Sequence, residues 1–236
     1  MKANSHMELI DDARGLMNIS LEENSSAEYL VLQGRGGQDA VESQFKITLP
    51  EGASLKMVFI SLEGESICNT IRVSLIGRHA SCELSGLSLA GGRQKIDYDI
   101  LMTHLVPECH SSQLFKNIIG GGAVTHFDGL IKVVPDAQKT EAYQANHNLL
   151  VSDDARAFTR PQLEIYADDV KCSHGATTGR LNPDELFYMR TRGIPVEEAM
   201  LLQQMAFAGE VTAKISSPGL RERIQSMVEK KLRGGL

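Results

Sequence analysis

A long succession of short β-rich runs constrains this chain more than any other feature. Between Glu28 and about Phe158 there is almost no helical periodicity, and many runs alternate apolar with polar residues, as Lys95 to Ile100 do. That alternation is the period-two pattern of a half-buried strand. Turn residues such as Pro50-Glu51-Gly52 separate the runs. The predicted strands are Tyr29–Leu32, Phe45–Leu49, Lys56–Leu62, Thr70–Leu75, Cys82–Leu89, Ile96–Thr103, Leu114–Ile119 and Leu130–Val134.

These runs predict a mainly β domain but do not determine its architecture. Their number and turn spacing fit a sandwich, a jelly roll or a solenoid. No strict short repeat is visible, so the residues alone do not demand a β-helix. A solenoid would leave open sheet ends, where a second copy or a related chain could pair.

The pattern changes to helix after Gly179. Asn182 is a candidate N-cap, followed by Pro183 and Glu185, and this helix is expected to stop at Gly193. Two more helices are expected, opened by Pro195 and by Ser217-Pro218. The chain is therefore divided into an N-terminal segment, residues 1–27, in which Ser5-His6-Met7 reads as a cloning remnant, a β core, 28–179, and a helical domain, 180–236.

Composition argues against several functional classes. The chain has 236 residues, 42% of them apolar, and a net charge of −6, so it lacks the basic field by which proteins bind nucleic acid without sequence preference. No run approaches the roughly 18 apolar residues of a membrane helix, and no signal-peptide core is visible, so we expect no membrane association and a cytoplasmic location. The glycine runs at 34–37 and 120–122 lack a following Lys-Ser or Lys-Thr, so we expect no bound nucleotide.

Cys172 and His174 form the candidate metal site. They are two residues apart, so in an extended segment both side chains leave the same face, with Cα atoms roughly 7 Å apart. A thiolate and an imidazole suit iron–sulfur clusters, iron or zinc. The nearby carboxylates Glu164, Asp168 and Asp169 could complete the site, orient the imidazole or flank a turn. By spacing alone, a half-buried strand end is the simpler explanation.

His147 is a further candidate beside a strand-like run. It could be a third ligand or a proton carrier near Cys172, or a satisfied polar residue at a strand end. With Cys172 and His174 it could also form the centre of a metal-dependent enzyme on a β-helix or cupin-like scaffold. A third hypothesis is a structural adaptor in which Cys172 is inert.

The segment QLEIYADDVKCSHGATTG, residues 162–179, resembles the signature of the SufB/SufD family of iron–sulfur cluster assembly proteins, on the SufD side. Three more stretches agree in order: Ala142–Ala155, Leu181–Ile194 and Glu197–Val211. The resemblance implies a right-handed parallel β-helix with a small C-terminal helical domain. It also implies a non-catalytic scaffold of the SUF system that pairs with SufB or with itself as a dimer.

The same resemblance implies roles for particular residues. The C-terminal helices would dock SufC, an ABC-type ATPase, with Phe187, Tyr188, Arg192, Gly193 and Ile194 near the contact. Cys172 and His174 would help to receive iron or hold a nascent iron–sulfur cluster transiently.

Departures from the family pattern qualify this reading. SufB proteins carry a cysteine near the position of Asn146 and a glutamate at the position of Gly175. Both differences favour a SufD-like chain and put unaided cluster assembly in doubt. The family's helical N-terminal region does not fit in this length, so we expect a compact or truncated member.

Overall fold

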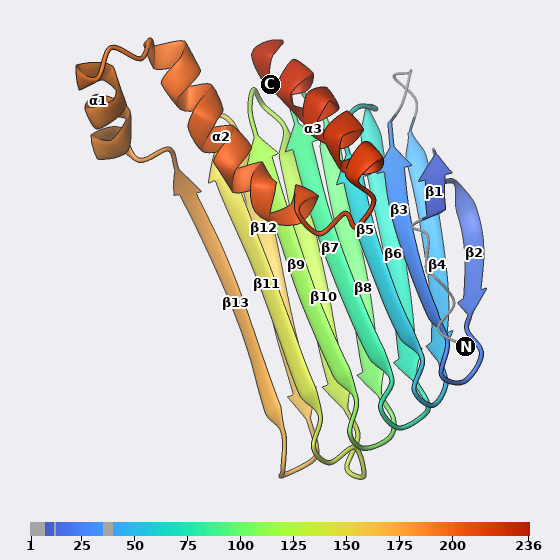
Figure 1. Cartoon of the computed structure of the whole chain (residues 1–236). Coiled ribbons are helices and arrows are strands. Elements are labelled where there is room, and N and C mark those ends of the chain that lie inside the picture. Colours follow the sequence, from blue (N-terminus) through green and yellow to red (C-terminus); the bar gives the residue numbers. More distant parts are fainter. Residues whose placement is uncertain (1–7, 12, 35–39) are drawn as a thin grey trace.

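The computed structural model describes residues 8–11, 13–34 and 40–236, so Ser5-His6-Met7 and most of the glycine run at 34–37 lie outside the described residues. The described part contains thirteen strands followed by three helices (Figure 1). The strands are β1 (Glu8–Asp11), β2 (Gly15–Ser20), β3 (Ser26–Gln33), β4 (Val41–Leu49), β5 (Ser54–Ser61), β6 (Ser66–Leu75), β7 (Ser81–Ala90), β8 (Lys95–His104), β9 (His110–Ile119), β10 (Val124–Val133), β11 (Glu141–Leu150), β12 (Arg156–Ile165) and β13 (Lys171–Arg180). The helices are α1 (Pro183–Thr191), α2 (Val196–Thr212) and α3 (Pro218–Arg233).

The strands wind into a parallel β-solenoid, as the family resemblance implies. Odd-numbered strands form a seven-stranded sheet and even-numbered strands a six-stranded sheet, and every paired neighbour is parallel. One ladder of stacked partners contains Leu55, Cys82, Ser111, Ala142 and Cys172, at intervals of 27, 29, 31 and 30 residues. Because the turn length varies, no strict repeat is visible in the sequence.

All eight predicted runs fall on strands, which confirms the reading of the period-two pattern. Strands β11, β12 and β13 lie in the predicted core but were not predicted as runs, because their sequences carry polar residues, glycine or, at Pro161, proline. Pro161 is tolerated because β12 is the edge strand of its sheet. Strands β1 and β2 fall within segment 1–27 and pair with β3 and β4, so they extend the solenoid.

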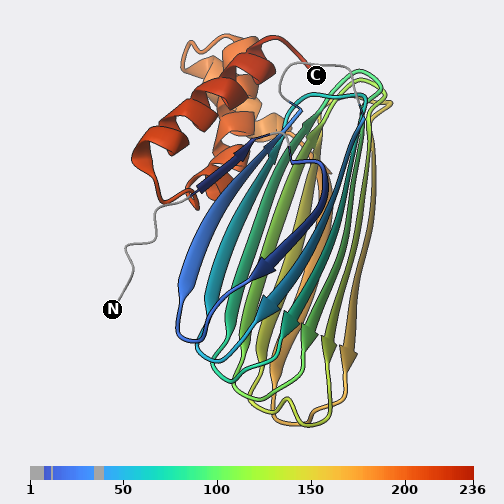
Figure 2. The same cartoon turned by 90° about the vertical axis from the view of Figure 1, so that its right-hand side faces the viewer.

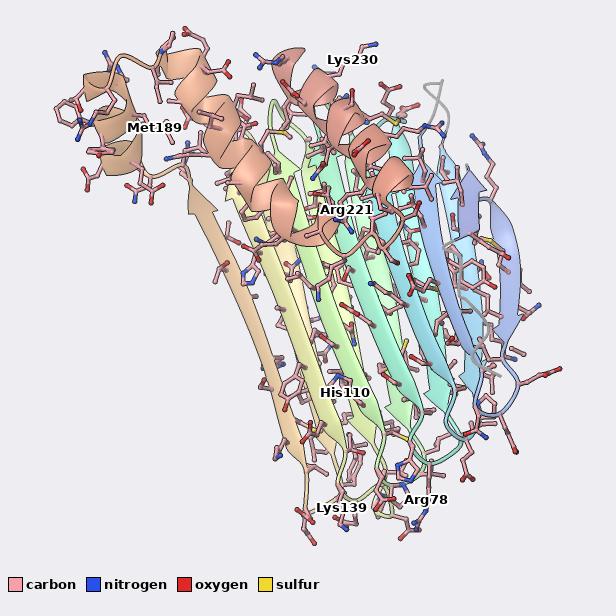
Figure 3. All side chains as sticks on the ribbon, in the orientation of Figure 1. Arg78, His110, Lys139, Met189, Arg221 and Lys230 are labelled. Carbon is pink, nitrogen blue, oxygen red and sulfur yellow. The ribbon has the colours of Figure 1, made fainter. Side chains whose placement is uncertain are left out.

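Left-handed residues recur at the lower turns of the solenoid. Asn24, Gly52, His79, Glu108 and Lys139 all have φ between 58° and 63°. Backbone bonds link successive turns, such as the one that the Glu108 amide donates to the Gln138 carbonyl at 2.9 Å. Only Gly52 among the five is a glycine, so glycine punctuation alone does not reveal this spacing. Arg78 and Lys139 lie at these turns (Figure 3) and pair with Glu108 at 3.5 and 3.8 Å.

The interior of the solenoid is held by aromatic and aliphatic packing. Phe45, Phe59, Tyr98, Phe115 and Phe127 form a continuous series of ring contacts, with centroids 4.9–6.1 Å apart. Such pairs stabilise by about 0.5–1.5 kcal/mol each beyond the area they bury. Aromatic residues make up only 5% of the chain, and these five lie within an interior core that is otherwise mostly aliphatic.

Helices α2 and α3 cover the upper part of the outer face of the seven-stranded sheet (Figures 1 and 2). Buried residues of α2 and α3, such as Leu201, Val211 and Val228, form a second core with Leu87 and Ile118 of the sheet. The predicted helix starts are confirmed, including the Asn182 cap, which accepts a hydrogen bond from the Asp184 amide. In the part of the chain that is described, no helix is long and apolar enough to cross a membrane.

Candidate functional site

Cys172 and His174 lie on β13, and both belong to its interior-facing set. Their ladder partners on β11 are Ala142 and Gln144, which are buried inside the solenoid. The segment is extended, so the condition under which the two side chains leave one face is met. Cys172 is half-buried at the edge of the interior core, whereas His174 is exposed. The thiol and the imidazole share one accessible surface.

This surface is the open end of the solenoid. Strands β12 and β13 end the two sheets, and each is paired on one side only within the described residues. Interior residues of this last turn, including Leu163, Ile165 and Val170, remain only partly buried. An edge strand with unpaired backbone groups is a template for pairing with another chain. The candidate ligands therefore lie where a partner could cover them.

The environment of Cys172 disfavours its thiolate form. Burial raises the pKa of Cys172, and a backbone hydrogen bond with Ala142 offsets part of that effect. A raised pKa lowers the thiolate fraction, and the thiolate is the metal ligand. Binding of iron at Cys172 would therefore release a proton.

The nearby carboxylates do not complete a metal site in this chain. Glu164 faces the outer side of the six-stranded sheet, where Lys132 lies 3.5 Å away. Asp169 belongs to a turn, where its carbonyl accepts the Lys139 amide at 2.5 Å. Among the described residues, no group of three His, Cys, Asp or Glu side chains is placed to hold a metal ion. Cys172 and His174 by themselves therefore do not make a closed metal site among the described residues.

The structure separates His147 from Cys172 and His174. Gln144 and Asn146 of β11 point into the solenoid and are buried. His147 follows Asn146 in the strand, so it points to the outer face. Its Nδ1 lies 2.7 Å from the Thr177 hydroxyl. Burial lowers the pKa of His147, the Lys116 ammonium lowers it further, and Glu210 acts in the opposite direction. The three residues proposed for an enzyme centre therefore do not lie on one face of the sheet.

Lys116, beside His147, anchors α2 to the sheet. Its side chain is 4% exposed, and its Nζ lies 2.6 Å from Glu210 and 3.3 Å from the Phe207 carbonyl oxygen. The same ammonium lies 4.3 Å from the centroid of the Phe207 ring. Lys116, His147 and Thr177 are partners across β9, β11 and β13. This polar row joins the helices to the last strand of the solenoid.

Helix α1 carries the predicted docking residues. It contains no buried residue, and Figure 1 shows it beyond the β13 edge of the sheet. Phe187 and Tyr188 are 67% and 59% exposed. The Arg192 guanidinium stacks on the Tyr188 ring at 5.2 Å and donates to its hydroxyl at 3.2 Å. Two large aromatic side chains at adjacent positions therefore remain exposed on this helix.

Gly193 and Ile194 complete the predicted docking group where α1 ends. Gly193 has a φ of +85°, a left-handed conformation that favours glycine. The Ile194 amide donates to the Met189 carbonyl at 3.2 Å. This turn therefore sets the orientation of α1 relative to α2.

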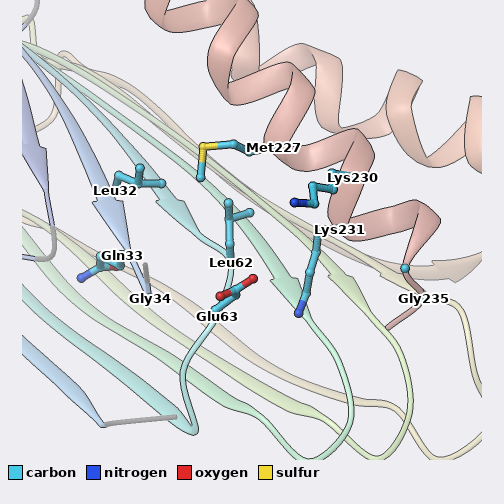
Figure 4. Close-up of a pocket in the computed structure, with 10 residues that line it drawn as sticks. Leu32, Gln33, Gly34, Leu62, Glu63, Met227, Lys230, Lys231 and Gly235 are labelled. Carbon is cyan, nitrogen blue, oxygen red and sulfur yellow. The ribbon is translucent and has the colours of Figure 1, made fainter. Parts of the chain in front are cut away.

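A cavity of about 400 Å³ lies between α3 and the upper ends of β3 and β5 (Figure 4). Leu32, Leu62 and Met227 provide apolar walls, and Lys230, Lys231 and Glu63 provide charges. None of the predicted site residues lines this cavity. It shares no residue with the open end of the solenoid.

Sequence reasoning did not identify Gln113 and Gln144. They are 2% and 3% exposed, and each has one amide atom without a hydrogen-bond partner among the described residues, Gln113 Nε2 and Gln144 Oε1. For Gln144, the sequence does contain a signal that could have been used: Gln144, Asn146 and Asn148 alternate along one strand, and three polar residues on the buried face of a strand are unusual. It can be interpreted only once the inward face is known.

Comparison with known proteins shows the family to which this chain belongs. The family described as SUF system FeS cluster assembly, SufBD core domain, matches residues 6–207. The chain belongs to the SufB/SufD family of iron–sulfur cluster assembly proteins.

Individual relatives show the same relationship. The iron-sulfur cluster assembly protein SufD of Escherichia coli is 35% identical over 80% of this chain and 45% of its own length. An iron-sulfur cluster assembly SufBD family protein of Mycobacterium leprae is 33% identical over 78% of this chain and 49% of its own. An iron-sulfur cluster assembly SufBD family protein from Synechocystis is 32% identical over 89% of this chain and 46% of its own length. The chain thus spans about half the length of the curated relatives it matches.

Proposed function

We propose that this chain is a non-catalytic scaffold subunit of the SUF iron–sulfur cluster assembly system. It docks a SufC-like ABC-type ATPase through its C-terminal helices and pairs through the open end of its solenoid with SufB or with a second copy. Family membership supports the assembly role. The exposed helix α1 is the observation that carries the docking role.

The docking proposal follows from the distribution of apolar groups on the helices. Helices α2 and α3 each bury several apolar residues against the sheet, whereas α1 buries none. Phe187 and Tyr188 therefore present aromatic surface that the fold itself does not use. Aromatic and arginine side chains are enriched among residues that dominate binding energy at interfaces, and Arg192 adjoins this pair.

The pairing proposal follows from the last turn of the solenoid. Strands β12 and β13 offer unpaired backbone edges, and the partly buried Leu163 and Ile165 gain cover when another chain is added. A partner at this end would also enclose Cys172 and His174. Helix α1 lies at the same end of the solenoid (Figure 1), so the proposed docking surface and the proposed pairing surface lie close together.

The substrate of the site would be iron or a nascent iron–sulfur cluster in transit. Cys172 supplies a thiolate after losing its proton, and His174 supplies a neutral ring nitrogen or accepts a proton. Two donors hold such a substrate weakly, which suits transfer, and the partner supplies the remaining ligands. No nucleotide binds to this chain, because ATP belongs to the docked ATPase.

The docking proposal is tested by light scattering on a size-exclusion column with a SufC-like ATPase from the same organism. We expect the wild-type chain to form a complex and the double variant Phe187→Ala, Tyr188→Ala to lose at least 10-fold in affinity. Leu202→Ala is the matched control, because Leu202 is an exposed apolar residue, 42% accessible, on the adjacent helix α2. Equal binding by all three chains would contradict docking through α1.

A further inference from the structure

An apolar row runs along the six-stranded sheet where its strands reach the lower turns. Each residue of the row directly follows the last residue of β4, β6, β8, β10 or β12, and those last residues are ladder partners from Leu49 to Ile165. Backbone bonds continue the stacking one residue further, as the Leu105 amide donates to the Leu75 carbonyl at 3.1 Å. The row consists of Pro50, Ile76, Leu105, Val134 and Tyr166.

The row leaves large apolar side chains in water. Strand ends such as Leu49 and Leu75 are buried inside the solenoid, so the residue after each points outward. Ile76, Leu105 and Tyr166 are 46%, 40% and 58% exposed. Helices α2 and α3 lie on the other sheet (Figure 2), so they do not cover this row. Apolar groups that are exposed next to one another mark interaction sites more often than single ones do.

The spacing of the row fits an α-helix better than a strand. Neighbouring strands are about 4.8 Å apart, so the row extends over about 19 Å. A helix brings one apolar position to the same face every turn of about 5.4 Å, a mismatch of about 0.6 Å at each step. Residues on one face of an extended segment are about 6.7 Å apart, a mismatch of about 1.9 Å. A helix of about 13 residues lying across the strands would therefore keep its apolar stripe on the row.

The lower turns beside the row carry unpaired acidic groups. Glu51, Asp136 and Asp168 are exposed, and none of them forms an ion pair with another residue that the structure describes. The basic residues of these turns, Arg78 and Lys139, are both paired with Glu108. The charge that is left unpaired beside the row is therefore negative, and it complements a basic partner.

We propose that this apolar row is a docking surface for a basic amphipathic helix of a partner protein. The apolar stripe of that helix covers Ile76, Leu105 and Tyr166, and its lysine or arginine side chains face the carboxylates of the lower turns. Burial of the apolar stripe supplies most of the affinity, and the charges set its orientation and its specificity for a basic partner. The row shares no residue with the docking and pairing surfaces proposed above, so the inference does not rest on the proposed function.

Fluorescence anisotropy with a labelled peptide of about 14 residues, with leucine on one helical face and lysine on the other, measures the docking. We expect the double variant Ile76→Ser, Leu105→Ser to bind the peptide about 10-fold more weakly than the wild type. Leu16→Ser is the matched control and should keep the wild-type affinity, because Leu16 is 63% exposed on β2 and pairs with outward-facing Gln44 of the same sheet. Circular dichroism checks that all variants are folded.

The charge part of the proposal has its own test. Asp136→Asn with Asp168→Asn should weaken binding about 3-fold at low salt and flatten its dependence on salt concentration. Equal binding of a peptide with glutamate in place of lysine would overturn the proposal.

Three other results would also overturn it: no binding of the lysine peptide, equal binding by the wild type and the Ile76→Ser, Leu105→Ser variant, or equal binding of the same residues scrambled so that no apolar face forms. Light scattering of the chain alone tests the other occupant. A dimer that is lost in Ile76→Ser, Leu105→Ser would assign the row to a second copy of this chain and not to a partner helix.

Discussion

The first turns of the solenoid and its last turn are built from the same ladder but differ in what they bury. In the first turns, Gln33 is completely buried and its amide is satisfied by Ser43, Asn69 and Ser61 at 2.7–3.1 Å. In the last turns, the amides of Gln113 and Gln144 each keep one unpaired atom, and the next partner in their ladder is exposed His174. The first turns thus contain a buried amide that is fully satisfied, whereas the last turns contain two amides with an unpaired atom next to the candidate site.

The largest expected effect comes from the aromatic series of the first turns. Phe59→Ala removes a fully buried ring that contacts Phe45 and Tyr98. We expect a loss of about 3–5 kcal/mol in the free energy of unfolding, because the surrounding sheet can collapse only partially into the cavity. Urea denaturation measures it. Phe158→Ala is the control, because Phe158 is 54% exposed on β12, and an equal loss there would erase the contrast between the two regions.

Acid should destabilise the chain through a histidine of the interior. Burial lowers the pKa of His104 to about 4, with nearby His110 adding to the effect, and its Nε2 lies 2.9 Å from the Ser111 hydroxyl. The unfolded chain binds this proton near pH 6.5, so the stability is fully present above that value and is lost as pH falls toward 4, by about 3 kcal/mol.

Urea denaturation at pH 7 and at pH 4.5 measures this loss. His104→Gln should lose less stability than the wild type on acidification, because it has no imidazole to protonate. His174→Gln, altered at the open end, should keep the wild-type loss. The prediction is refuted if His104→Gln and the wild type respond equally to acid.

The smallest expected effect on folding is at the candidate site. Cys172→Ser and His174→Ala should change the free energy of unfolding by less than about 0.5 kcal/mol, because both positions lie at the uncovered end and not in the closed core. Both should lower iron–sulfur cluster assembly measured with the partner proteins present. Wild-type assembly by both variants would favour the structural adaptor, in which Cys172 is inert.

The sequence predicted strands whose apolar residues alternate, and it missed β11, whose inward residues are mostly polar, β12, which contains Pro161, and β13, which is rich in polar residues and glycine. Runs such as Ile96–Thr103 were recognisable because one face must leave water. Strand β13, KCSHGATTGR, has no such pattern, because its inward face lies at the open end and few of its residues are covered. The family motif marked Cys172 and His174 as a candidate site, but the segment was not predicted as a strand.

The sequence by itself determined that the chain is mainly β with C-terminal helices, because hydrophobic periodicity and helix caps are local properties. It also implied that Cys172 and His174 share a face if their segment is a strand, because residues two apart in a strand point the same way; the structure supplied the strand. Only the tertiary structure decided that His147 lies on the opposite side of the sheet from Cys172 and His174, and that α1 is left uncovered. It also decided that Gln113, Gln144 and His174 are successive partners in one ladder. Those relations depend on the ladder register between strands about 30 residues apart, which is set by the lengths of the intervening turns.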